Sequence, residues 1–115
     1  MKKLLLALTL LGALSSGSAY AGYSYCRSSQ QTSSDSWNVY IHRSGSAPIA
    51  LPMEYRYSYI SGGTVYTTSW TALPNATDVY VGGVGNGGGI ISIEVRSSVY
   101  IGSTNTNPIT VLSPC

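Results

Sequence analysis

The sequence has few charged residues, and no lysine beyond its third position. Charged residues make up 9% of the chain, and Lys2 and Lys3 account for its formal net charge of +2. The other charges balance, because four arginines stand against four carboxylates: Arg27, Arg43, Arg56 and Arg96, and Asp35, Glu54, Asp78 and Glu94. A neutral surface gives no electrostatic footprint for nucleic acid or an anionic membrane, so neither partner is expected.

Residues suited to catalysis or metal binding are also scarce. His42 is the single histidine. A Ser–His–acid hydrolase would have to combine it with Asp35 or Asp78, and no G-x-S-x-G nucleophile elbow is present. Two cysteines and one histidine form an incomplete set of zinc ligands. We therefore interpret His42 as a surface residue, and we expect no catalytic residue, metal or cofactor.

The carboxylates offer a second route to catalysis, as the acid pair of a glycoside hydrolase. Glu54 and Glu94, however, each stand two residues before an arginine, Arg56 or Arg96, on the same strand face. This spacing indicates solvated cross-strand ion pairs instead.

The chain has no phenylalanine, although it has ten tyrosines and two tryptophans. A core selected for packing alone would include some phenylalanine, because each buried tyrosine hydroxyl needs a hydrogen-bond partner. Tyrosine combined with serine, glycine and asparagine is also the composition of antibody paratopes. We therefore expect a recognition surface of exposed rings, whose candidates are Tyr40, Tyr66, Trp70, Tyr80 and Tyr100.

A ladder of three further tyrosines, Tyr55, Tyr57 and Tyr59, has two interpretations. It could be a flat platform for sugar rings or for a protein. We favour the alternative that it faces inward, because Glu54 and Arg56 take the opposite strand face.

No apolar run is long enough to cross a membrane, which needs about 20 residues. The most apolar stretch, Leu4–Leu14, instead follows Lys2 and Lys3 and precedes Ala19-Tyr20-Ala21. A positive start, a short apolar run and an A-x-A site are the pattern of a bacterial-type secretory signal peptide. We predict that residues 1–21 are cleaved and that residues 22–115 form a single domain in the periplasm or the medium.

Cysteine is limited to Cys26 and Cys115, near the two ends of the predicted mature chain. In an oxidising compartment one pair allows one connectivity, so we predict a Cys26–Cys115 disulfide. The loop-closure model gives so long a ring about 4–5 kcal/mol. A lipid anchor on Cys26 is the weaker alternative, because Tyr23-Ser24-Tyr25 is too bulky for a lipoprotein signal.

A sustained helical period is absent, and several stretches alternate with a period of two. Gly62-Gly63 predicts a tight hairpin turn. The odd positions from Ile91 to Ile101 are apolar except Ser97, which predicts one long strand with a bend near Ser97-Ser98. Six or seven short strands without a helix predict an all-β fold, a small antiparallel Ig- or fibronectin-like sandwich closed by one disulfide.

The glycine run at residues 83–88 matches the dinucleotide-binding pattern G-x-G-x-x-G. That motif must open a helix, whereas the residues from Ile90 onward predict a strand. The segment Gly82 to Gly89 is therefore interpreted as a flexible hairpin loop. An alternative is that its glycines let a partner approach the backbone.

These observations predict an exported, non-catalytic binding module. Its ligand would be a protein, such as an enzyme that it inhibits, or a cell-surface glycan. The alternatives are a structural subunit of a surface fibre or matrix and, less favoured, a small secreted hydrolase. An unpaired strand would favour the fibre, and a concave face with clustered tyrosine and tryptophan would favour the binding module.

Overall fold

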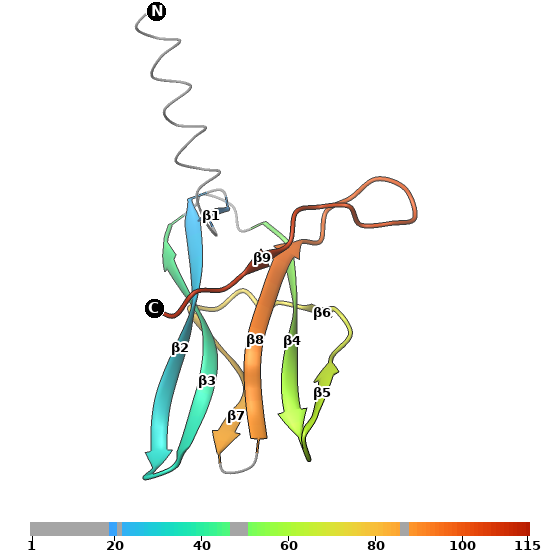
Figure 1. Cartoon of the computed structure of the whole chain (residues 1–115). Coiled ribbons are helices and arrows are strands. Elements are labelled where there is room, and N and C mark those ends of the chain that lie inside the picture. The colour runs from blue at the N-terminus through green and yellow to red at the C-terminus, as the bar shows by residue number, and fades with distance from the viewer. Residues whose placement is uncertain (1–18, 21, 47–50, 86–87) are drawn as a thin grey trace, which may run out of the picture.

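The computed structural model describes residues 19–20, 22–46, 51–85 and 88–115 (Figure 1). Within them the chain forms β-strands and no helix, which confirms the predicted all-β class. Residues 1–18 and 21 of the predicted signal peptide lie outside the described residues, so its cleavage stays a prediction. The strands are β1 (Ala19–Tyr20), β2 (Tyr23–Ser33), β3 (Ser36–Gly45), β4 (Met53–Ser61), β5 (Thr64–Thr67), β6 (Thr71–Ala72), β7 (Asp78–Gly85), β8 (Gly88–Ser97) and β9 (Thr110–Val111).

The strands form an antiparallel sheet in the order β1-β2-β3-β7-β8-β4-β5, with β6 added to β4 and β9 added to β8. β7 and β8 pair only beside their hairpin, at Val84–Gly89 and Gly85–Gly88. Beyond these pairs the two strands diverge, as Figure 1 shows. The sheet is therefore continuous at the hairpin and open between β7 and β8 farther along.

The C-terminal segment connects two parts of the sheet that are distant in strand order. The Leu112 amide donates to the Ile93 carbonyl of β8 over 2.9 Å. The Arg27 amide of β2 then donates to the Ser113 carbonyl, and the Cys115 amide donates back to the Arg27 carbonyl, each over 2.9 Å. This segment therefore bridges β8 and β2.

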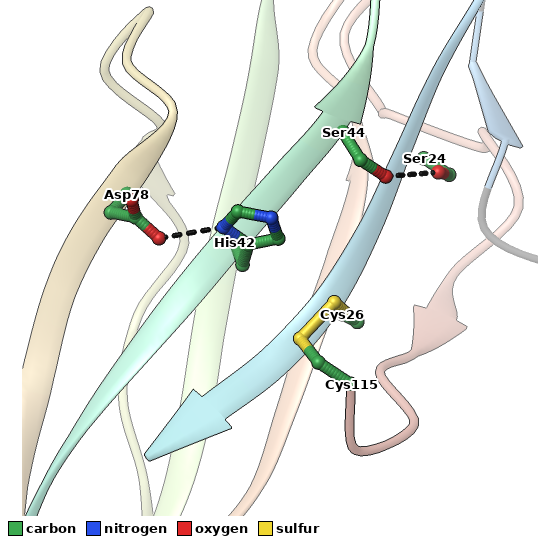
Figure 2. The surroundings of a disulfide bond; sticks show 6 residues. All are labelled: Ser24, Cys26, His42, Ser44, Asp78 and Cys115. Atoms are coloured by element: carbon green, nitrogen blue, oxygen red, sulfur yellow. Dashed lines mark hydrogen bonds and ion pairs between the residues drawn. A yellow bond between two sulfur atoms is a disulfide. The ribbon is translucent and has the colours of Figure 1, made fainter. Parts of the chain in front are cut away.

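The predicted disulfide is confirmed and holds this bridge in place. Cys26 and Cys115 are bonded, with their Cα atoms 5.0 Å apart (Figure 2). The bond joins the last residue of the chain to β2, 89 positions earlier. It is consistent with an oxidising location outside the cytoplasm.

The core contains side chains from the strands on both sides of the gap between β7 and β8. Its buried residues come from β2, β3 and β7, from β4 and β8, and from the C-terminal segment: Tyr25, Val39, Ile41, Met53, Val79, Val81, Ile90, Ile93, Val95 and Leu112. Ile93 and Val95 are fully buried. Alternation along each strand places these residues inward and their polar neighbours outward.

The prediction that the odd positions from Ile91 onward share one apolar strand face is wrong at Ile91. Ser92 pairs with Ser58 of β4, but Ile90 pairs with the next residue, Tyr59. Ile91 is the extra residue of a β-bulge, so Ile90 is buried whereas Ile91 is 48% exposed. A bulge inserts one unpaired residue and shifts the faces of all residues beyond it.

The predicted long strand also ends early, because β8 stops at Ser97. Asn105 and Asn107 donate their side-chain amides to the Ser97 carbonyl over 2.9 and 3.1 Å. The chain then leaves the sheet in a loop, where Val99 is exposed and Ile101 is fully exposed. The hairpin prediction at Gly62-Gly63 is confirmed, since both glycines have positive φ, 58° and 79°, between β4 and β5.

Candidate functional site

The predicted aromatic candidates include one direct ring pair. Tyr40 of β3 and Tyr80 of β7 are register partners, and their rings meet edge to face with centroids 5.7 Å apart. They lie on the outer face, opposite the buried Val39, Ile41 and Val79. Tyr80 is exposed and Tyr40 is half-buried.

In the described residues, the other three candidates make no ring contact with Tyr40 or Tyr80. Tyr66 stacks on Tyr59, with centroids 5.3 Å apart. Trp70 lies against Arg56, which takes the opposite face of β4 from Tyr59. Tyr100 is exposed in the loop after β8. β5 ends at Thr67 and β6 pairs with β4 again at Thr71, with the register shifted by one residue. The positions of Tyr66 and Trp70 along the sequence therefore do not determine a common face.

The predicted cross-strand ion pairs are confirmed between β4 and β8. Arg56 Nε donates to Glu94 Oε1 over 2.9 Å, and Arg96 Nε donates to Glu54 Oε1 over 2.6 Å. Asn105 adds a hydrogen bond to Glu54 Oε1 over 2.8 Å. The sequence indicates freely solvated pairs, but all four charged side chains are partly buried. Both carboxylates are therefore held by structural partners.

Trp70 covers these ion pairs. Its ring lies 4.6 Å from the guanidinium carbon of Arg56 and 3.9 Å from that of Arg96. A cation over an indole face is attracted by the ring quadrupole, by about 0.5–1 kcal/mol when exposed and about 2 kcal/mol when desolvated.

We expect Trp70→Ala to lower the free energy of unfolding by about 1–2 kcal/mol, because both contacts are lost. Urea denaturation of the wild type and variant measures this change. Trp70→Phe, which keeps a smaller ring over the arginines, is the control and should lose less. Equal stability of the alanine variant and the wild type would contradict a structural role for the ring.

His42 lies on the outer face of β3, beside the disulfide. Its Nδ1 is 2.7 Å from Asp78 Oδ1 (Figure 2). Asp78 is one of the two acids that a Ser–His–acid hydrolase could combine with His42. The nearby Ser24 hydroxyl is hydrogen bonded to Ser44 over 2.9 Å, and no serine of the described residues hydrogen-bonds His42. Among the residues that the structure describes, this surface pair has no aligned nucleophile.

We expect His42→Ala to change the free energy of unfolding by at most about 1 kcal/mol, the usual range for an exposed ion pair. Ligand binding, once measured, should be unaffected. Asp78→Asn is the matched control and should behave in the same way. Loss of a measurable hydrolytic activity in a folded His42→Ala protein would overturn this interpretation and support the hydrolase.

A groove of about 560 Å³ opens between β4 and the β7–β8 hairpin. We call it the tyrosine–glycine groove, after the residues that line it: Tyr57, Tyr59, Ile60, Ser61, Thr68, Gly82, Gly83, Gly85, Gly88 and Gly89. None of these lining residues is charged. The Tyr57 and Tyr59 rings lie 5.9 Å apart and are tilted by 47°.

The tyrosine ladder therefore takes part in both packing and the groove. Tyr55, Tyr57 and Tyr59 are half-buried and pack against the core, which supports the inward interpretation. Tyr57 and Tyr59 also line the tyrosine–glycine groove. Alternation favours the inward face for the ladder, but it gives only the face of a residue and not whether that face is fully covered.

The glycines of the groove differ in what the fold requires of them. A Cβ at Gly88 would overlap the Ile60 carbonyl oxygen, and Gly89 has a φ of +140°. At Gly83 the nearest atom to an added Cβ is the Trp37 oxygen, 3.6 Å away, an ordinary contact. Packing explains glycine at positions 88 and 89, whereas it does not explain glycine at position 83.

Comparison with known proteins gives no relative for this chain. Within the described residues, no helix is long and apolar enough to cross a membrane, and no three metal-binding side chains gather. No protein-family model, curated protein or solved structure matches the sequence or the fold.

Proposed function

We propose that this chain is an exported, disulfide-closed β-domain that acts by binding a protein or a cell-surface glycan, and not by catalysis. The observation that carries the proposal is the tyrosine–glycine groove. It is a depression open to solvent, its lining is uncharged, and its volume lies in the range of about 300–1,000 Å³ typical of ligand sites.

The two walls of the groove supply complementary interactions. Tyr57 and Tyr59 offer rigid aromatic area with hydroxyl groups at the ring edge, at low cost in side-chain entropy. Gly82 and Gly83 offer backbone without side chains, which lets a ligand approach the strand closely. Ser61 and Thr68 add hydroxyl groups at the lining.

The proposal extends to the fold and location. β2, β3 and β7 would form one layer, and β4 and β8 the other, of an Ig- or fibronectin-like sandwich with the buried cluster between them. Cleavage after Ala21 would release this domain into the periplasm or the medium. The disulfide supports an oxidising destination.

A structural subunit of a surface fibre is the second candidate, and one observation favours it. In the described residues, β2 pairs only with β3 along Ser28–Ser33, past the contact with the C-terminal segment. An open strand edge can pair with another chain. Sedimentation velocity over a wide concentration range tests this candidate, because a fibre subunit should assemble and a binding module should stay monomeric.

The binding proposal is tested by blocking the groove. Ser61 is exposed and lines the groove, on the same face of β4 as Tyr59. Ser61→Trp should therefore abolish capture of ligands from envelope proteins and from a glycan array, while leaving the unfolding transition unchanged. Val65→Trp places the same side chain at an exposed position of β5 that does not line the groove, and it should bind as the wild type does. Equal capture by both variants would refute the groove as the binding site.

A further inference from the structure

In the described part of the chain, β7 has a main-chain edge that no other strand pairs with along most of its length. It pairs with β3 from Asp78 to Val84 around a bulge at Val81, but with β8 only at Val84 and Gly85. Since the amides and carbonyls of a strand alternate between its two edges, part of the backbone from Val79 to Gly83 points away from β3. An edge of this kind is a template for pairing with another strand.

This edge borders the tyrosine–glycine groove. Gly82 and Gly83 belong to the edge and line the groove, and Tyr57 and Tyr59 of β4 line it as well. Natural strand edges are usually protected by lysine, by proline, by an inward-facing charge or by a bulge such as the one at Val81 of β7, which does not line the groove. The described residues that line the groove include none of these.

We propose that the groove accepts an extended polypeptide strand, which pairs with β7 between Val79 and Gly83. Alternate side chains of that strand would contact the rings of Tyr57 and Tyr59. The inference rests on the proposed binding function and specifies its ligand as a polypeptide. Main-chain hydrogen bonds give such a complex its affinity, and the pockets for alternate side chains give its specificity.

The chemistry of the groove also indicates the kind of peptide. Its uncharged lining favours uncharged side chains, because an ionised group would lose hydration without gaining a partner. Gly83, which packing does not require, leaves room for the incoming backbone. A segment with alternating β-branched and small polar residues fits both conditions, since such residues favour an extended conformation.

The test uses the ¹⁵N-labelled, disulfide-bonded protein purified from the periplasm. The probes are a pool of capped, uncharged hexapeptides with alternating valine or tyrosine and threonine or serine, and the tetrasaccharide of N-acetylglucosamine. Binding of a peptide should shift the amide signals of β7 and slow hydrogen exchange at amides between Val79 and Gly83. Two N-methylated forms of the best peptide, modified at odd or at even positions, test the pairing directly.

One N-methylated form should bind about tenfold more weakly, because it loses the donors that face β7, and the other should bind as the parent peptide does. Gly82→Ala, which places a methyl group 2.9 Å from Ile90 Cδ1 beside the groove, should also weaken binding. Equal affinity of the parent and both N-methylated peptides would overturn strand pairing while leaving the groove a binding site. Binding of the tetrasaccharide alone would also overturn it, and would support a glycan ligand. If neither probe binds, the strand proposal fails, while the Ser61→Trp comparison still decides the binding function.

Discussion

Removing the disulfide is expected to lower the free energy of unfolding by about 2–5 kcal/mol, the usual range for a native bridge in a small exported domain. The bond between Cys26 and Cys115 spans 89 positions, so it restricts most of the unfolded domain. Comparing urea denaturation of the wild type with that of a Cys26→Ala, Cys115→Ala double variant measures the effect. Reduction of the wild-type protein provides an independent control with unchanged side-chain volume.

The structure also predicts which part of the domain opens first when the disulfide is removed. The C-terminal segment is held by the disulfide and by the backbone hydrogen bonds of Arg27 and Leu112. Hydrogen exchange at these two amides should accelerate more than exchange at Ile93 and Val95, which are fully buried in β8. Two labelled thiols per chain in the exported protein, or a disulfide-linked dimer, would show that the intramolecular bond is wrong.

Gly88→Ala is expected to destabilise the domain by about 3 kcal/mol, the upper part of the usual range for overpacking. The added methyl group would overlap the Ile60 carbonyl oxygen. The methyl group would be attached directly to the β8 backbone and the oxygen belongs to the β4 backbone, in the ladder where Ser61 pairs with Gly88. A flexible side chain could move away, but these strands cannot separate without breaking their hydrogen bonds. Thermal and urea unfolding measure the change.

Gly83→Ala is the matched control in the adjacent strand. Its methyl group would meet only the Trp37 oxygen at 3.6 Å, and Gly83 does not have a positive φ. Replacing glycine by alanine at a compatible position stabilises a protein by about 0.4–1 kcal/mol, because the unfolded chain loses freedom. Similar losses in both variants would mean that the glycines of the groove are all required for packing.

Several features of this protein follow from its sequence because they depend on local chemistry or on a single allowed pairing. Two cysteines permit one intramolecular disulfide. Alternating apolar residues bury one strand face, and Gly62-Gly63 supplies the positive φ angles of a tight turn. The arginines two positions after Glu54 and Glu94 lie opposite carboxylates when the two strands pair in register. The turn and the strand faces needed only the neighbouring residues along the chain, and the disulfide needed only the number of cysteines.

Tertiary structure decided the candidate site. The bulge at Ile91 depends on how β8 pairs with β4, and alternation along β8 alone gives no sign of it. The unpaired edge of β7 exists because β8 diverges from it after two pairs. Tyr57 and Tyr59 line an open groove because that divergence leaves their inward face partly uncovered. Alternation determines which face a side chain takes, but the distance to the next strand determines whether that face is covered.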